Sequence, residues 1–257
     1  MAGTTMVIGF AHRGAPALCQ RENALPAFRR ALAAGANGLE SDVWLTADGV
    51  PVLRHDATLG PAWLPWRRRV AELRRADLPR WMPTLAELYQ DAGRPFELSL
   101  DLKGRPAGMS ATAAAEAVLS VVRAEGGQAA LRRLWLCGPL SDLRAWRQLD
   151  GDVRLVNSTS AAEVAANGGA AAYARVLRDA GVDTLNLRTR EWTPARAGIV
   201  ADLHAAGILA FGWDAQSAAT LRRLLGYGLD GLYSDHLHRL VEVTATPRPR
   251  RPLTSDG

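Results

Sequence analysis

Short apolar runs alternate with longer amphipathic segments along most of this chain. The apolar runs lie near 6–11, 38–45, 96–103, 133–137, 153–157, 184–188, 208–213 and 231–234, and the run at 51–55 extends the second region. Their length and composition are typical of buried strands. Segments with helical spacing lie between and after them, near 23–34, 84–92, 111–125, 141–149, 169–180, 194–206, 217–227 and 237–243.

Several of these helical segments end on a glycine that precedes the next apolar run, as in AGANG, AGVDT, AAGILA and YGLDG. Glycine readily adopts the left-handed conformation that ends a helix. Eight strands alternating with eight helices predict a single α/β domain, a (β/α)8 TIM barrel over residues 1–245. An open doubly wound sheet is the alternative, but no glycine-rich dinucleotide or P-loop motif supports it.

The composition is that of an ordinary globular protein, with 48% hydrophobic and 22% charged residues. Part of the formal net charge of +5 comes from residues 246–257, which we expect to be a disordered basic tail. The arginine runs at 67–69 and 74–75 are not interleaved with aromatic residues as a surface for single-stranded nucleic acid would be. We therefore expect no nucleic-acid partner.

Cysteine usage and hydropathy favour a cytoplasmic protein. Cys19 and Cys137 match no disulfide framework and no metal-ligand spacing, so we expect two free thiols in a reducing compartment. The N-terminal residues lack the basic region of a signal peptide. No apolar run approaches the roughly 20 residues that a membrane-spanning helix needs, and we expect no stable membrane insertion.

Polar residues gather at the ends of the first three predicted strands, where a barrel carries its reactive groups. His12 follows the first strand, Glu40 and Asp42 share one face of the second, and His55 follows its extension. On the third strand, Leu98, Leu100 and Leu102 are expected to face the helices, and Glu97, Ser99, Asp101 and Lys103 the barrel interior. Lys103 is also the only lysine of the chain, which suggests a specific need for an ammonium there.

Burying three carboxylates and an ammonium together is costly unless they pair or bind a cation. Oxygen ligands from Glu40, Asp42 and Asp101 favour one divalent cation, Mg²⁺ or Ca²⁺. Two histidines near it could act as general base and general acid, in an order that the sequence leaves open. Arg13 and Lys103 could neutralise charge developing on phosphorus. The combination indicates metal-assisted cleavage of a phosphodiester.

The motifs AHRG, REN and GLESDVWLTADGVPVLRHD closely resemble those of the glycerophosphodiester phosphodiesterase family. The likeness continues through PTLAEL, DLK, Trp213 and GLDGLYSD, and so covers most of the chain. It implies a TIM barrel that hydrolyses small-molecule glycerophosphodiesters to an alcohol and glycerol 3-phosphate. It also implies site residues: His12 and His55 as catalytic histidines, Glu40, Asp42 and Asp101 as metal ligands, and Arg13, Lys103 and Trp213 as phosphate- or substrate-binding residues.

Two departures from the family pattern keep other functions open. Asp101 stands where the family usually has glutamate, and TLGPAWLPWRRR follows His55-Asp56 in place of the usual continuation. Trp63 and Trp66 in that segment could hold an acyl chain, so a lysophospholipase D-type lipid phosphodiesterase is one alternative. A non-catalytic barrel that binds phosphodiesters is the other, although none of the expected acids and histidines is missing. Neither the preferred alcohol nor the oligomeric state is indicated.

Overall fold

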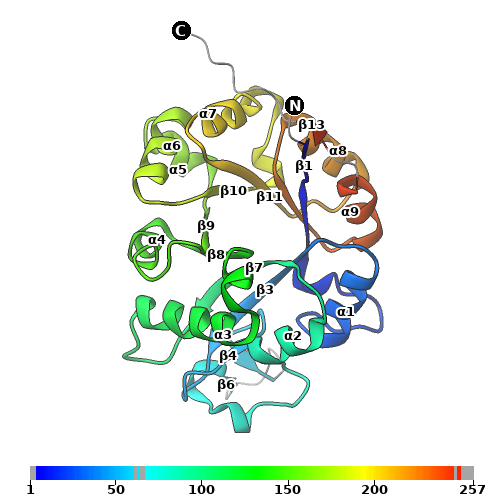
Figure 1. Cartoon of the computed structure of the whole chain (residues 1–257), viewed down its shortest axis with the longest axis vertical. Helices are drawn as coiled ribbons and strands as arrows, with labels where there is room; N and C mark the ends of the chain where they lie inside the picture. Colours follow the sequence, from blue (N-terminus) through cyan, green and yellow to red (C-terminus); the bar gives the residue numbers. More distant parts are fainter. Residues whose placement is uncertain (1–3, 61–62, 64–66, 246–247, 250–257) are drawn as a thin grey trace.

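A closed eight-stranded parallel barrel surrounded by helices forms the body of the molecule (Figure 1). The computed structural model describes residues 4–60, 63, 67–245 and 248–249. The barrel strands are β2 (Ile8–Ala11), β3 (Gly38–Leu45), β7 (Glu97–Gly104), β8 (Leu134–Gly138), β9 (Arg154–Ser158), β10 (Thr184–Arg188), β11 (Leu209–Trp213) and β12 (Gly231–Ser234). The pairing of β2 with β3 closes the ring, which confirms the predicted single-domain (β/α)8 TIM barrel.

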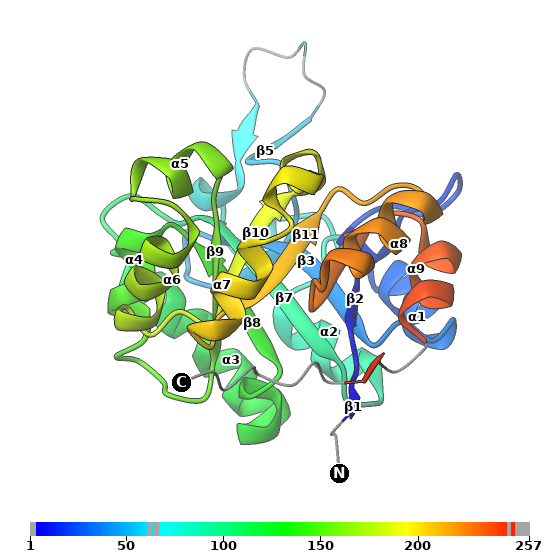
Figure 2. The same cartoon turned by 90° about the horizontal axis from the view of Figure 1, so that it is seen from above.

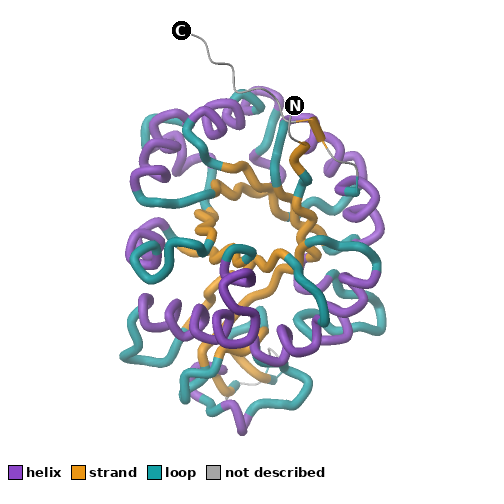
Figure 3. Tube along the Cα trace, viewed as in Figure 1, coloured by secondary structure: helices purple, strands orange, loops and turns teal. Residues whose placement is uncertain are grey.

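The helices surround this ring of strands, as Figure 3 shows. They are α1 (Leu25–Ala33), α2 (Leu85–Ala92), α3 (Ala111–Leu131), α4 (Leu140–Trp146), α5 (Ala161–Ala166), α6 (Ala170–Asp179), α7 (Ile199–Ala205), α8 (Ala218–Tyr227) and α9 (Leu237–Thr244). Thr84 and Glu87 form a capping box at the start of α2, which is one local reason why that helix begins there. The short helix α5 was not anticipated from the sequence.

The two faces of each barrel strand meet different surroundings. Leu98 and Leu100 belong to the large core between strands and helices, and Leu102 packs against it, as the alternation on β7 predicted. The barrel interior holds a separate buried cluster made of Phe10, Trp135, Cys137, Val156, Phe211 and Tyr233. The barrel is therefore a packed core rather than a channel, and it includes a buried polar contact between Ser99 and the Tyr233 hydroxyl at 3.1 Å.

The connection between β3 and β7 carries most of the additions to the barrel. β4 (Pro51–Leu53) pairs antiparallel with β3 and stays outside the ring. β5 (Thr58–Leu59) and β6 (Arg68–Arg69) form a small hairpin that stands out from the barrel (Figure 2). The following segment, which contains short 3₁₀ helices at Val70–Glu72 and Arg75–Asp77, is anchored by a cluster of Val52, Val70, Leu73, Leu78 and Met82. The sequence predicted no elements in that segment.

The two ends of the described chain lie together. β1 (Thr4–Thr5) pairs antiparallel with β13 (Arg248–Pro249). Apart from β13, the predicted basic tail at 246–257 lies outside the described residues. Both cysteines are free as expected, with Cys19 exposed and Cys137 buried. Within the described ranges, no helix is long and apolar enough to cross a membrane.

Candidate active site

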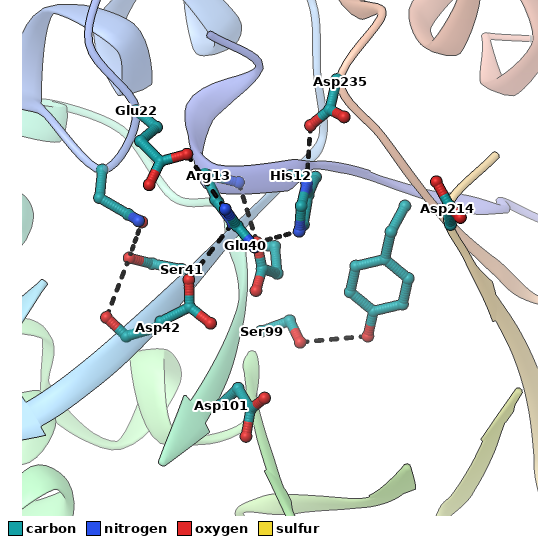
Figure 4. A network of polar contacts seen from close by, with 12 residues as sticks. His12, Arg13, Glu22, Glu40, Ser41, Asp42, Ser99, Asp101, Asp214 and Asp235 are labelled. Atoms are coloured by element: carbon teal, nitrogen blue, oxygen red, sulfur yellow. Dashed lines mark hydrogen bonds and ion pairs between the residues drawn. The ribbon is translucent and has the colours of Figure 1, made fainter. Parts of the chain in front are cut away.

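Side chains at the carboxyl ends of β2, β3 and β7 form one polar surface. Glu40 and Asp42 lie opposite Ser99 and Asp101 in the register of β3 and β7. His12 follows β2 directly, and Figure 4 shows it between Glu40 and Asp235. We call Glu40, Asp42 and Asp101 the acid row.

His12 is held by a carboxylate on each side. Its Nδ1 lies 2.6 Å from Asp235 Oδ1, and its Nε2 lies 3.8 Å from Glu40 Oε2. Burial opposes protonation of the ring, but the charges of Glu40 and Asp235 outweigh it and raise the pKa of His12 to about 9. In the metal-free protein at neutral pH, His12 is therefore an imidazolium whose Nδ1–H donates to Asp235.

The acid row is buried at one end and paired with cations at the other. Glu40 accepts a hydrogen bond of 2.8 Å from the backbone N–H of Arg13. Lys103 donates to Asp101, and its ammonium also lies 3.2 Å from Asp42 Oδ1. The sequence-based grouping of Lys103 with these acids thus appears in the structure as direct contacts.

Negative charge is crowded at Glu40. Burial raises the pKa of its carboxyl group, and repulsion from Asp42 and Asp101 adds to the effect, while His12 and the Arg13 N–H oppose it, giving a pKa of about 7. On the other side of the row, Asp42 Oδ2 is buried and accepts no hydrogen bond among the described residues. The cationic Arg13 Nε lies 3.5 Å from this oxygen.

Arg13 connects the acid row to the loop that follows β2. Its guanidinium contacts Asp42 and also donates to Glu22 Oε2 over 3.1 Å. The backbone of Arg13, Ala15 and Asn23 has positive φ angles of 51°, 52° and 51°. Non-glycine residues seldom adopt this conformation, and such strain concentrates at functional sites. Of the described non-glycine residues, only one other has positive φ, namely Asp214 after β11.

The other two predicted site residues lie at the edge of this surface. His55 follows β4, where the N–H of Arg54 donates to the backbone carbonyl of Asp42 and so places His55 at the end of β3. The His55 ring is half-exposed, with Nδ1 3.0 Å from Asp56 Oδ1. Among the residues described, it makes no hydrogen bond or ion pair with His12 or the acid row.

Trp213 ends β11 on the inward-facing side of the strand, because Leu209 and Phe211 on the same face line the barrel interior. Its side chain remains 38% exposed. Arg188, its direct partner in the register of β10 and β11, lies over the indole with its guanidinium carbon 5.1 Å from the ring centroid.

The sequence analysis missed a set of residues on the opposite side of the barrel mouth, which we call the rim network: Arg188, Asp214, Gln216 and Asp235. Arg188 donates to Asp214 Oδ2 from Nε and Nη2, over 2.9 and 2.6 Å. The Gln216 amide donates to Asp214 over 3.1 Å and to Asp235 over 2.7 Å. Asp235 was visible in the sequence as the last residue of GLDGLYSD, whereas nothing in the sequence connected Arg188 or Gln216 to His12.

Several known proteins are similar to this chain in sequence or fold. The model of the glycerophosphoryl diester phosphodiesterase family matches residues 12–239. This chain belongs to that family. A Mycobacterium tuberculosis protein described as a probable glycerophosphodiester phosphodiesterase 2 is 29% identical over 92% of this chain and 90% of its own length.

Solved structures agree with the membership. A candidate glycerophosphoryl diester phosphodiesterase from Silicibacter pomeroyi DSS-3 is 26% identical and superposes with a TM-score of 0.77, covering 94% of each chain. An Oleispira antarctica phosphodiesterase, solved in complex with its product sn-glycerol-3-phosphate, shares the fold at 21% identity and a TM-score of 0.76, over 92% of this chain and 96% of that one. The sequence-based assignment to the glycerophosphodiester phosphodiesterases is confirmed.

Members of the family generally depend on a divalent metal ion. In the described part of this chain, no three histidine, cysteine, aspartate or glutamate side chains stand in a ready-made metal-binding arrangement. Instead, the Lys103 ammonium contacts both Asp42 and Asp101.

Proposed function

We propose that this chain uses a divalent cation and two histidines to hydrolyse glycerophosphodiesters to an alcohol and glycerol 3-phosphate. The observation that carries the proposal is the position of His12, which lies between Asp235 and the acid row at the mouth of the barrel. Family membership supplies the reaction class, and the residues at this mouth supply groups of the required chemistry.

The donor set fits a hard cation. Glu40, Asp42 and Asp101 offer only oxygen ligands, which Mg²⁺ and Ca²⁺ prefer. Asp42 Oδ2 is buried and accepts no hydrogen bond among the described residues, and the pKa of Glu40 is raised first by burial and then by the charges of Asp42 and Asp101. A bound cation would relieve both, with these three carboxylates as its protein ligands. When bound, such an ion would polarise phosphate oxygens and stabilise the charge that develops on them.

His12 is suited to exchanging a proton through Nε2. Its Nδ1 is engaged with Asp235, which fixes the orientation of the ring and leaves Nε2 directed to the acid side of the mouth. We assign His12 and His55 as the acid–base pair for a displacement in which an oxygen nucleophile bonds to phosphorus and the alcohol oxygen leaves with a proton. The nucleophile is water, which gives glycerol 3-phosphate directly, or a neighbouring glycerol hydroxyl, which gives a cyclic phosphate that water then opens to glycerol 3-phosphate.

Arg13 and Lys103 are assigned to the phosphate. Both are cations already held against Asp42, so their charges are fixed in place before substrate arrives. Preorganised positive charge of this kind stabilises the dianionic transition state without reorganisation during the reaction. Trp213 is assigned to the substrate because it is exposed at the same mouth.

The test is a product-release assay on glycerophosphocholine, glycerophosphoethanolamine and lysophosphatidylcholine, each with Mg²⁺, Ca²⁺ or EDTA. We expect glycerol 3-phosphate from the first two with a divalent ion and none with EDTA. Full activity in thoroughly demetallated protein would refute the cation assignment. Binding without hydrolysis under every condition would favour a non-catalytic barrel.

One observation favours the lipid-directed alternative. Trp63, between β5 and β6 of the projecting hairpin, is 79% exposed, and large exposed aromatic side chains commonly bind lipid or protein. Trp66 lies outside the described residues. Release of choline from lysophosphatidylcholine at a rate exceeding that from glycerophosphocholine would establish a lysophospholipase D activity as the main one.

A further inference from the structure

Arg188 of the rim network and the neighbouring Trp213 lie side by side at the barrel mouth, and Arg188 has no role assigned so far. Arg188 and Trp213 are register partners on β10 and β11. Leu185 and Leu187 pack outward in the core between strands and helices, so the alternation of β10 directs Arg188 inward. The side chains of Arg188 and Trp213 are each 38% exposed. A chain of hydrogen bonds through Asp214, Gln216 and Asp235 connects Arg188 to His12.

The pair has a distinctive electrostatic character. The guanidinium of Arg188 lies over the indole of Trp213, in the position that a quaternary ammonium group would take on an open aromatic ring. The same guanidinium binds Asp214 through two N–H groups, so the carboxylate is neutralised as well. Its Nη1 makes no hydrogen bond to any described residue, which leaves donors for a ligand hydroxyl.

We propose that Arg188, with Asp214 and Trp213, is a specificity-determining residue that receives the alcohol group of the diester and selects uncharged polyols over quaternary ammonium alcohols. The inference rests on the proposed function, which places phosphorus beside His12, Arg13 and Lys103. One ester arm then lies toward the acid row, and the other lies toward β10 and β11.

The selection follows from the two attractions that Arg188 removes. A choline group is normally bound by a bare aromatic face and an unpaired carboxylate, and here both are already occupied by the same cation. The positive charge of Arg188 also repels an incoming ammonium. A glycerol or inositol group does not need a bare aromatic face or an unpaired carboxylate. Its hydroxyls accept hydrogen bonds from guanidinium N–H groups and donate to carboxylate oxygens.

Replacing Arg188 should reverse the preference. In Arg188→Met, the Trp213 ring is uncovered and Asp214 is left as an unpaired carboxylate, which together suit a choline group. We expect kcat/KM for glycerophosphocholine to rise about tenfold relative to kcat/KM for glycerophosphoglycerol, a change typical of one gained or lost pocket contact. Wild-type protein should prefer glycerophosphoglycerol.

Arg222→Met is the matched control. Arg222 also pairs with a carboxylate, that of Glu242 at 2.7 Å, but on the outer helices α8 and α9, so its loss should leave the ratio unchanged. Arg188→Gln provides a second variant if the methionine protein is poorly folded. Its amide can still bond Asp214 but carries no charge, and the ratio should shift in the same direction by a smaller factor.

The outcomes separate the two levels of the argument. A wild-type preference for glycerophosphocholine, an unchanged ratio in folded Arg188 variants, or an equal fall for both substrates would overturn the inference while leaving the proposed function intact. No hydrolysis of either diester by metal-loaded wild-type protein would overturn the proposed function, and this inference with it.

Discussion

The two halves of the barrel mouth handle charge in different ways. On β3 and β7, the acid row crowds three carboxylates around two cations, and the buried Asp42 Oδ2 accepts no hydrogen bond from the part of the chain that the structure describes. On the side of β10 to β12, each carboxylate of the rim network has a direct cationic partner, since Asp214 binds Arg188 and Asp235 binds His12. The Gln216 amide bridges these two pairs.

The difference is consistent with the roles proposed for the two halves. Buried carboxylates in excess of their partners are costly, so a protein retains them where an external cation or a reacting group completes the site. Pairs that are already satisfied hold their members in fixed positions. His12 belongs to both halves, because Nδ1 contacts the rim network and Nε2 faces the acid row.

The strongest test of this division removes the histidines. His12→Ala and His55→Ala should each lower kcat by roughly 10²–10⁴-fold, as expected for a general acid–base group. Because the proposed mechanism has both histidines act on one phosphorus, the double variant should be little worse than the poorer single variant. Turnover and thermal melts of metal-loaded protein would measure this.

His238→Ala is the control, since that exposed histidine on α9 touches neither half of the mouth. If folded, metal-loaded His55→Ala kept near wild-type turnover, His55 would not be a catalytic residue. Another group near the acid row would then have to transfer the second proton. The same result for His12 would remove the link between the two halves.

The next test changes the acid row alone. Asp101→Glu restores the family's usual side-chain length, and we expect it to alter the activation ratio of Mg²⁺ to Ca²⁺ by several-fold, about one order of magnitude at most. The physical reason is that Mg²⁺ demands nearly ideal ligand geometry, whereas Ca²⁺ tolerates longer and more variable distances.

Metal titrations of activity, with Asp179→Glu on the exposed surface of α6 as control, would measure the shift. An identical ion preference in Asp101→Glu and wild type would show that Asp101 is not a ligand. The crowding of the acid row would then have to be explained by Glu40 and Asp42 with Lys103.

The acid row and Lys103 were far easier to predict from sequence than the rim network. Glu40, Asp42, Asp101 and Lys103 lie two residues apart on strands, so the period of two alone places them on common faces. The barrel followed from the alternation of apolar and amphipathic segments and the glycines between them. These patterns involve residues close together in the chain, so they can be recognised in a single sequence without an alignment.

The rim network depends on contacts between distant segments. Asp235 meets His12 from 223 positions away, and Arg188 meets Asp214 from 26. A single arginine or glutamine after a strand has no pattern that reveals its partner. The β5–β6 hairpin was missed for a related reason, because two-residue strands are too short for any periodicity.

A smaller effect concerns the contact of the rim network with His12, which should make the free energy of unfolding depend on pH. The raised pKa of His12 means that its interactions with Glu40 and Asp235 stabilise the folded protein fully below pH 6.5, and that this contribution is lost as pH rises through about 9. Because the pKa of Asp235 is lowered, its carboxylate stays charged at mildly acidic pH, and its interaction with His12 is lost there only when the carboxyl is protonated. Asp235→Asn should therefore reduce the free energy of unfolding by about 1–2 kcal/mol at pH 6 and much less at pH 9.

Urea unfolding of EDTA-treated protein between pH 5 and 9 would measure this, with Asp179→Asn as the exposed control. A deficit that stayed constant over this range would mean that Asp235 stabilises the fold without holding the His12 imidazolium. The rim network would then be a packing feature and not a support for His12.

The smallest expected effect lies outside both halves of the mouth. Trp63 contributes to neither the acid row nor the rim network, and its side chain is mostly exposed on the β5–β6 hairpin. Trp63→Ala should leave kcat/KM for glycerophosphocholine within about twofold of wild type and change the free energy of unfolding by no more than about 0.5 kcal/mol. Trp81→Ala is a useful comparison, because that indole is covered by the guanidinium of Arg21 at 3.9 Å and also lies 5.7 Å from that of Arg54. If Trp63→Ala lowered turnover of the small diester tenfold or more, the hairpin would have to reach the site, and the mouth would have a third part. A loss confined to lysophosphatidylcholine would instead assign Trp63 to the acyl chain and leave the two-part description of the mouth unchanged.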